Sequence, residues 1–163
     1  MAATPAVGRG SRIAAVRCAT VLLCMNFSFF NRLQVKKIVA ASSEAGHRAE
    51  AMLAALLREQ PELLLAYIAD SQTGNILASY TANSAYNPNQ LNLRTTKLLG
   101  TMDETLVANS WLGGPLLDMS VLLEDQLHYL RPIADGQWHC YVAVRLADAN
   151  LGILKEVVRQ ATT

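Results

Sequence analysis

Residues 63–80 read LLLAYIADSQTGNILASY and decide how the rest of the chain is interpreted. The run 63–69 is almost wholly apolar and short, which favours a strand that is covered on both faces. Asp70 can accept hydrogen bonds from the backbone that follows it, and Gly74 can adopt a positive φ. Residues 76–80 are apolar again, so the stretch predicts a β-hairpin.

Before the hairpin, the spacing predicts a helix over residues 43–60. Ser42 or Ser43 can cap its start by accepting a hydrogen bond from a free backbone N–H. Pro61 ends it, since proline supplies no helical N–H. Its apolar residues recur on one face and are Met52, Leu53, Leu56 and Leu57.

After the hairpin, a polar loop over 81–90 leads to a second predicted helix over 89–111. Gly100 weakens this helix by about 1 kcal/mol relative to alanine, and Gly113-Gly114-Pro115 stops it. Its apolar stripe consists of Leu91, Leu98, Leu99, Met102, Leu106 and Val107.

The last third predicts strands over 119–123, 126–131 and 137–145, separated by polar turns. A final helix follows a cap at Asp148 or Asn150, with Leu151, Leu154, Val157 and Val158 on its apolar face. We therefore expect an α/β (α+β) fold with a five-stranded antiparallel sheet, in the order α-β-β-α-β-β-β-α.

The chain divides into a basic leader, residues 1–42, and a domain, residues 43–163. Residues 1–48 hold seven Lys and Arg against one acidic residue. The leader is interpreted as disordered, as a mis-called start before Met25, or as a signal or membrane anchor. A further interpretation of the leader is an amphipathic helix that lies on an anionic membrane surface. Membrane binding is therefore expected only if the leader is retained.

The sequence motifs argue against catalysis, a metal site or a cofactor. No serine lies in a G-x-S-x-G motif and no phosphate-binding loop is present. His128 and His139 share a face only if their connecting turn has the right length, and two imidazoles are one ligand short of a catalytic zinc site. Trp111 and Trp138 are core residues or interface anchors. Because the domain is acidic, nucleic-acid binding is not expected.

The order of elements, the Asp70 to Gly74 turn and the closing segment 148–153 resemble the roadblock/dynein light chain family, over about residues 43–160. Its fold is roadblock/profilin-like, and it includes MglB-like small-GTPase regulators. The resemblance implies cytoplasmic dimers that join their sheets edge to edge and pack their second helices together. Carried onto this chain, the helix contact consists of Leu91, Arg94, Leu98, Met102 and Thr105, although Leu98 and Met102 can instead face their own sheet.

The function implied by the resemblance is a dimeric protein-interaction module that binds and regulates a small Ras-like GTPase and has no catalytic site of its own. Its partners would be itself, as a homodimer, or another roadblock protein, together with the GTPase. One alternative is a non-catalytic scaffold or dynein motor-adaptor subunit. Another is a profilin-like sensory domain with a small-molecule pocket between sheet and helix.

Overall fold

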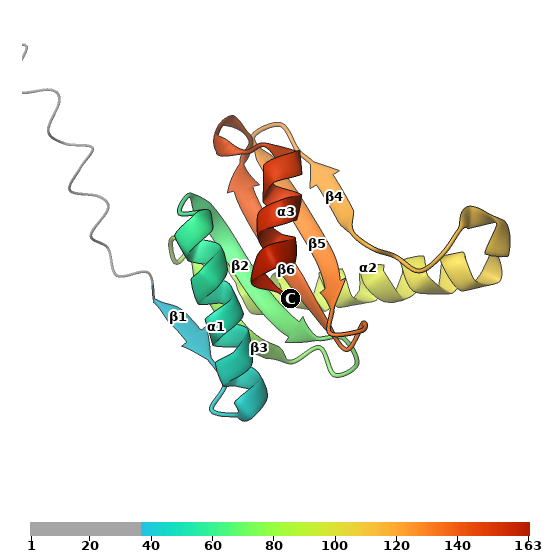
Figure 1. The fold of residues 1–163 in the computed structure, drawn as a ribbon, viewed down its shortest axis with the longest axis horizontal. Helices are drawn as coiled ribbons and strands as arrows, with labels where there is room; N and C mark the ends of the chain where they lie inside the picture. Colours follow the sequence, from blue (N-terminus) through green and yellow to red (C-terminus); the bar gives the residue numbers. More distant parts are fainter. Residues whose placement is uncertain (1–36) are drawn as a thin grey trace, which may run out of the picture. The chain divides into compact units, whose positions relative to one another are not determined.

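A computed structural model describes residues 37–163, which form a mixed α/β fold (Figure 1). The strands and helices, in chain order, are β1 (Ile38–Ala40), α1 (Glu44–Glu59), β2 (Leu63–Asp70), β3 (Ile76–Thr81), α2 (Pro88–Ala108), β4 (Met119–Leu122), β5 (Gln126–Ile133), β6 (Trp138–Arg145) and α3 (Leu151–Ala161). Two short 3-10 turns, η2 (Ser110–Leu112) and η3 (Leu146–Asp148), follow α2 and β6. The sheet is antiparallel in the order β1-β3-β2-β6-β5-β4.

The sheet has six strands, so the expectation of five was wrong. The additional strand is β1, which pairs Ile38 with Tyr80 and Ala40 with Ala78 of β3. With three residues it is too short to show an alternating pattern, and it lies inside the segment interpreted as a leader. Residues 1–36 of that segment lie outside the described residues.

Helix ends follow local capping chemistry. Ser43 is the α1 cap, and its Oγ accepts a hydrogen bond from the Gly46 N–H at 3.0 Å. Gly46 has no room for a side chain, since a Cβ there would lie 2.0 Å from the Ala41 carbonyl oxygen. Asn150, rather than Asp148, caps α3.

Helix α2 ends at Ala108, before the predicted limit of residue 111. There the chain tightens into η2, which begins one residue beyond the Asn109 cap. Such 3-10 turns are frequent at the ends of α-helices.

The hairpin turn between β2 and β3 is held by Asp70. Its Oδ1 accepts hydrogen bonds from the N–H groups of Gln72 at 3.0 Å and Thr73 at 2.7 Å. These bonds hold the pKa of the Asp70 carboxyl below its usual value. Gly74 has a φ of +69°, the left-handed conformation that favours glycine.

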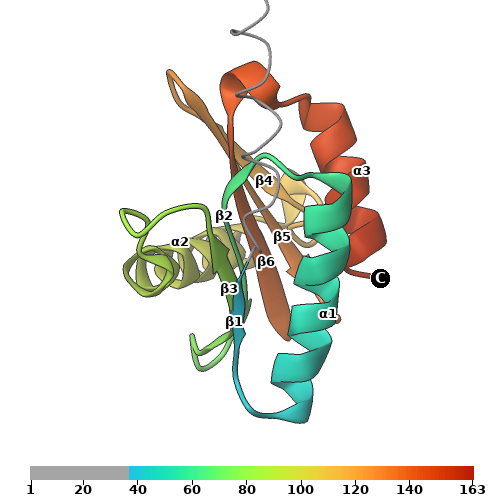
Figure 2. The same ribbon diagram turned by 90° about the vertical axis from the view of Figure 1, so that its left-hand side faces the viewer.

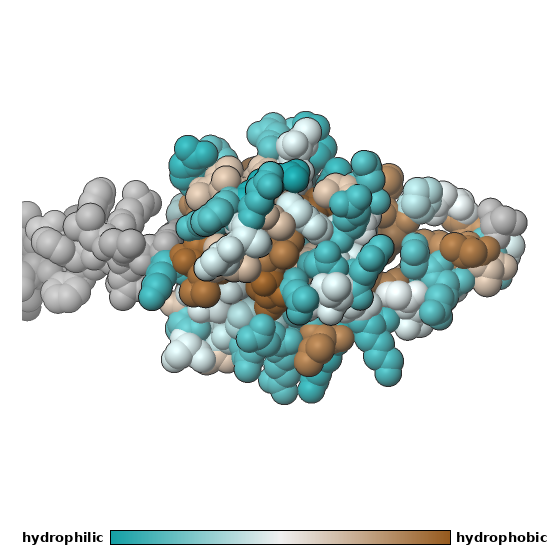
Figure 3. All heavy atoms as spheres, turned by 90° about the horizontal axis from the view of Figure 1, so that it is seen from below, coloured by the Kyte–Doolittle hydropathy of each residue, from teal (hydrophilic) through white to brown (hydrophobic). Residues whose placement is uncertain are grey.

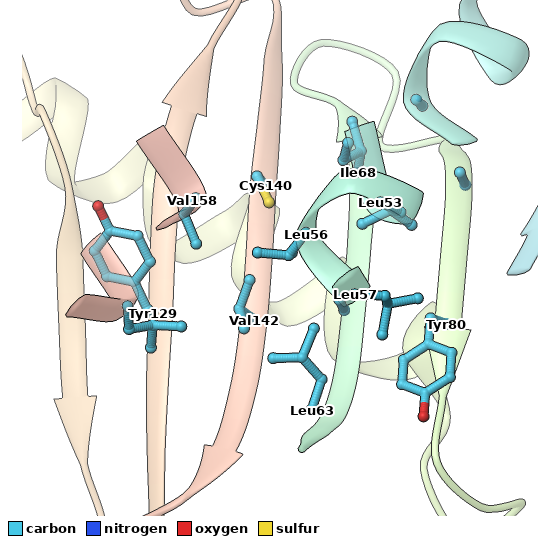
Figure 4. Packing of buried hydrophobic residues seen from close by; sticks show 14 of the residues in the cluster. Leu53, Leu56, Leu57, Leu63, Ile68, Tyr80, Tyr129, Cys140, Val142 and Val158 are labelled. Carbon is cyan, nitrogen blue, oxygen red and sulfur yellow. The ribbon is translucent and has the colours of Figure 1, made fainter. Parts of the chain in front are cut away.

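Helices α1 and α3 cover one face of the sheet, and α2 lies on the other (Figure 2). The α1/α3 side holds the larger core, which joins Leu53, Leu56 and Val158 of the helices with Ile68 of β2 and Val142 of β6 (Figure 4). Cys140 belongs to this core, and burial raises the pKa of its thiol to about 12. Cys140 is therefore a small core residue, as expected.

The core beneath α2 is smaller. Tyr67 and Tyr141 stack with their ring centroids 5.0 Å apart, and Leu91 and Leu99 of α2 pack over them. Few α2 side chains take part, because Asn92 and Thr95 are the only buried residues described in this 21-residue helix.

Candidate interaction surface

Helix α2 is anchored to the sheet through its first half by buried polar groups. The Asn92 side-chain amide donates to the Gly74 carbonyl at 2.6 Å, and its Oδ1 lies 3.1 Å from Nε2 of His139. Since that oxygen can only accept, His139 carries its proton on Nε2. Burial lowers the pKa of His139 to about 4, which keeps the imidazole neutral. These bonds tie the first turns of α2 to β6 and to the hairpin turn.

The second half of α2 extends beyond the sheet, past β4, and carries η2 at its end (Figure 1). None of its described side chains is buried. Val107 and Trp111 are each 80% exposed. In Figure 3, brown apolar atoms mark the end of the molecule where α2 and η2 project. A helix end with exposed apolar side chains of this size indicates a binding surface.

A groove of about 260 Å³ lies between α2 and the sheet near the β4 edge. Its walls are mostly apolar and come from α2, from strands β4, β5 and β6 and from the β4–β5 turn. The lining residues are Leu91, Arg94, Thr95, Leu98, Met119, Val121, Leu123, His128, Tyr129, Leu130 and Tyr141. Strand β4 is the last in the sheet, so its outer edge has no neighbouring strand among residues 37–163. The groove and the open edge therefore adjoin.

Nδ1 of His128 is hydrogen-bonded to the Tyr141 hydroxyl in the groove wall. Its Nε2 is buried without a hydrogen-bond partner among the described residues. Burial lowers the pKa of His128, so the ring is neutral near pH 7.

The helix residues predicted for a dimer contact all lie on α2, and we call them the groove face: Leu91, Arg94, Leu98, Met102 and Thr105. Leu91, Arg94 and Leu98 line the groove. Leu98 is 44% exposed, and Met102 is half-buried. Thr105 is exposed, and its hydroxyl donates to the Thr101 carbonyl at 2.7 Å. Neither Leu98 nor Met102 is therefore buried against its own sheet.

His128 and His139 fall on the same face of the sheet, because β5 pairs Ile133 with Trp138 across the connecting turn. The two histidines are nevertheless separated along the strands. His139 is opposite Pro132, which lies four residues beyond His128 on β5. Among residues 37–163, no cluster of three or more His, Cys, Asp or Glu side chains could hold a metal ion.

The two tryptophans differ in environment. Trp138 is 8% exposed and belongs to the core, where the Arg48 guanidinium lies 5.1 Å from its ring centroid. Trp111 is exposed at the projecting end of α2. Of the two alternatives for the tryptophans, core residue and interface anchor, Trp138 therefore matches the first, and the exposure of Trp111 is compatible with the second. Within residues 37–163, no helix is both long and apolar enough to cross a membrane.

Solved structures with the same arrangement have low sequence identity to this chain. MglB from Myxococcus xanthus has a TM-score of 0.64 and 11% identity, over 76% of this chain and 89% of that chain. The gliding protein MglB from Thermus thermophilus has a TM-score of 0.59 and 22% identity, over 76% and 90%. A roadblock/LC7 domain from Streptomyces avermitilis has a TM-score of 0.57 and 13% identity, over 68% and 88%.

At the level of sequence, no protein-family model and no curated protein matches the chain. The likeness is therefore one of structure. It covers at least two thirds of this chain and nearly nine tenths or more of each of the three structures. The chain has the roadblock/LC7 fold of MglB-like proteins.

Proposed function

We propose that this protein is a dimeric, cytoplasmic roadblock-type interaction module that binds and regulates a small Ras-like GTPase. The observation that carries the proposal is the projecting second half of α2 beside an apolar groove, in an MglB-like fold. The module has no active site of its own in this proposal, and its effect on GTP hydrolysis is exerted through the GTPase's own residues.

The open edge of the sheet supports pairing of two copies. Strand β4 has no neighbouring strand on its outer side among the described residues, and such edges are templates for another strand. Three apolar side chains at this edge, Val121, Leu122 and Leu123, are 43–67% exposed. A two-fold axis beside β4 would join the strands of two copies in one continuous sheet.

The same two-fold axis would explain the length of α2. Because its second half extends past β4, that half would lie over the sheet of the partner copy. Met102 and Thr105 of one copy would then approach the partner's groove. The groove face would become the helix contact of the dimer, with Leu91, Arg94 and Leu98 of each copy covered by the other.

The oligomeric state tests the dimer directly. We expect light scattering of the full chain to give the mass of two or more copies, and Met102→Asp to reduce it, because a carboxylate would be buried in an apolar contact. Ala51→Asp is the matched control, since Ala51 is exposed on α1, across the sheet from α2. Circular dichroism should show both variants folded. A wild-type monomer, or a folded Met102→Asp variant of unchanged mass, would contradict the proposed contact.

The GTPase is tested with a purified Ras-like GTPase encoded in the same genome, preferably beside this protein. We expect binding and a changed rate of GTP hydrolysis with the wild-type chain. Binding without any change in hydrolysis would favour a scaffold or motor-adaptor subunit instead. Failure to bind any such GTPase would remove the regulatory proposal.

The groove itself supports a second candidate, a sensory domain that binds a small apolar molecule. A volume of about 260 Å³ lies just below the range of about 300–1,000 Å³ for small-molecule sites, so only a small ligand would fit. Such a ligand would raise the thermal unfolding midpoint of the chain. If it also lowered the mass in light scattering, the ligand and the partner copy would occupy the same groove.

A further inference from the structure

A second surface of α2, distinct from the groove face, consists of Leu93, Lys97, Gly100, Glu104 and Val107, and we call it the outer stripe. The residues are spaced by four, three, four and three positions, which places them on one side of a helix. All five are exposed. Leu93 is 71% and Val107 80% exposed, so the stripe has an apolar side chain at each end.

The outer stripe is symmetric about its centre. Gly100 occupies the middle, with opposite charges at Lys97 and Glu104 on its two sides and apolar residues at Leu93 and Val107 beyond them. If two such helices cross at Gly100 in opposite directions, Lys97 of each copy faces Glu104 of the other. In the same register, Leu93 of each copy faces Val107 of the other. The stripe is thus complementary to itself in the antiparallel orientation.

The charged side chains of α2 are not stabilised by interactions within their own helix. Its charged residues are Arg94 and Lys97 in the first half and Asp103 and Glu104 in the second. This order is opposite to the one that the helix dipole favours, and no two opposite charges stand three or four positions apart. None of these side chains forms an ion pair with another residue of 37–163. An antiparallel second copy would supply the missing partners.

Contacts within one chain likewise give no reason for a glycine at position 100. A methyl group built on its Cα meets no atom within 4 Å, and its φ is not in the left-handed region. The glycine therefore weakens α2 by about 1 kcal/mol relative to alanine without a local reason. At a helix crossing, however, a residue without a side chain lets the two axes approach closely, since the axial distance depends on the side chains at the contact.

We propose that the outer stripe binds the outer stripe of a second copy of this chain, with the helices antiparallel and crossing at Gly100. The contact is selective for the chain itself, because a different roadblock protein would need the same order of charges and a small residue at the crossing. The groove face remains free to form the dimer proposed above. Use of both faces would join two such dimers through their α2 helices.

Charge exchange at Lys97 and Glu104 tests the pairing. Lys97→Glu and Glu104→Lys each turn two reciprocal ion pairs into like-charge contacts, so each should weaken self-association roughly tenfold. The double variant with both changes should recover the wild-type association, because the complementary order is only reversed. An equimolar mixture of the two single variants should also associate. Glu59→Lys, an exposed site on α1, makes the same change of charge as Glu104→Lys and should have no effect.

Cross-linking locates the crossing point. In a chain with Cys18→Ser and Cys24→Ser, Gly100→Cys should form a disulfide with its own copy under mild oxidation. Leu93→Cys lies on the same stripe, but its two copies would be about 20 Å apart in an antiparallel pair, at 1.5 Å per residue. Leu93→Cys should therefore remain reduced.

The outcomes separate this proposal from the proposed function. Cross-linking at Gly100→Cys with recovery in the charge-exchanged variant would support the outer stripe. Equal masses for wild type, Lys97→Glu and Glu104→Lys at all concentrations would overturn it, as would cross-linking of Leu93→Cys, which indicates parallel helices. An effect of Met102→Asp alone would leave the groove face as the contact and remove the outer stripe.

Discussion

The two faces of the sheet differ in how completely they are covered. On the face of α1 and α3, two helices contribute buried side chains to one large core (Figure 4). On the face of α2, a single helix is fixed by Asn92 and Thr95, and its second half leaves the sheet (Figure 1). Stability is therefore concentrated on the first face, and the second retains the apolar surface that binding requires.

The largest expected effect compares the same substitution on the two sides. Leu53→Ala on α1 should lower the free energy of unfolding by about 3 kcal/mol, because Leu53 is fully buried and its loss leaves a cavity. Leu93→Ala on α2 should change it by less than about 0.5 kcal/mol, since this side chain is 71% exposed. Urea unfolding at low protein concentration measures both values. Equal losses would mean that α2 also belongs to the stable core.

A second comparison concerns pH, because the anchor of α2 contains a neutral histidine. The pKa of His139 is about 4 in the folded chain, whereas the ordinary pKa of a histidine, expected in the unfolded chain, is 6.5. The unfolded chain therefore binds more protons between these values, and stability should fall as the pH drops from about 7 to about 4.5. The expected loss from His139 is about 2 kcal/mol, and His128, whose pKa is also lowered, contributes with the same sign.

His139→Gln provides the test of this assignment. Its amide can still meet Asn92 but does not titrate, so the variant should show a flatter decline of unfolding free energy with falling pH. Asp70, which raises the pKa of His139 by its charge, remains in both proteins. An unchanged slope would assign the pH dependence to other groups.

Most of the fold was predictable because its signals are local. The apolar run of β2, the Asp70 turn and the amphipathic pattern of α1 each depend on residues close in the chain. β1 was not predictable, since three residues carry no period and only pairing with β3 makes them a strand. The end of α2 was missed because Trp111 continues an apolar pattern, whereas the chain there forms a 3-10 turn.

The interaction surface was predictable only in part. The sequence placed Leu91, Leu98 and Met102 on α2, but their exposure depends on where the helix leaves the sheet, which no local pattern encodes. The outer stripe was visible as a spacing of four and three residues around Gly100. It was not singled out, because an exposed face with charged residues is usually only a solvated surface.

The smallest expected effect is also the most informative about α2. A single substitution should stabilise the isolated chain and weaken the association of two copies. Gly100→Ala should raise the stability of the isolated chain by up to about 1 kcal/mol, since alanine favours the helix and its methyl group meets open space. The same methyl group should weaken association if two helices cross at this residue. Glu59→Ala, at an exposed position on α1, is the control and should leave association unchanged. Urea unfolding of dilute protein and light scattering of concentrated protein measure the two effects, and a gain in both would mean that Gly100 is not at a helix crossing.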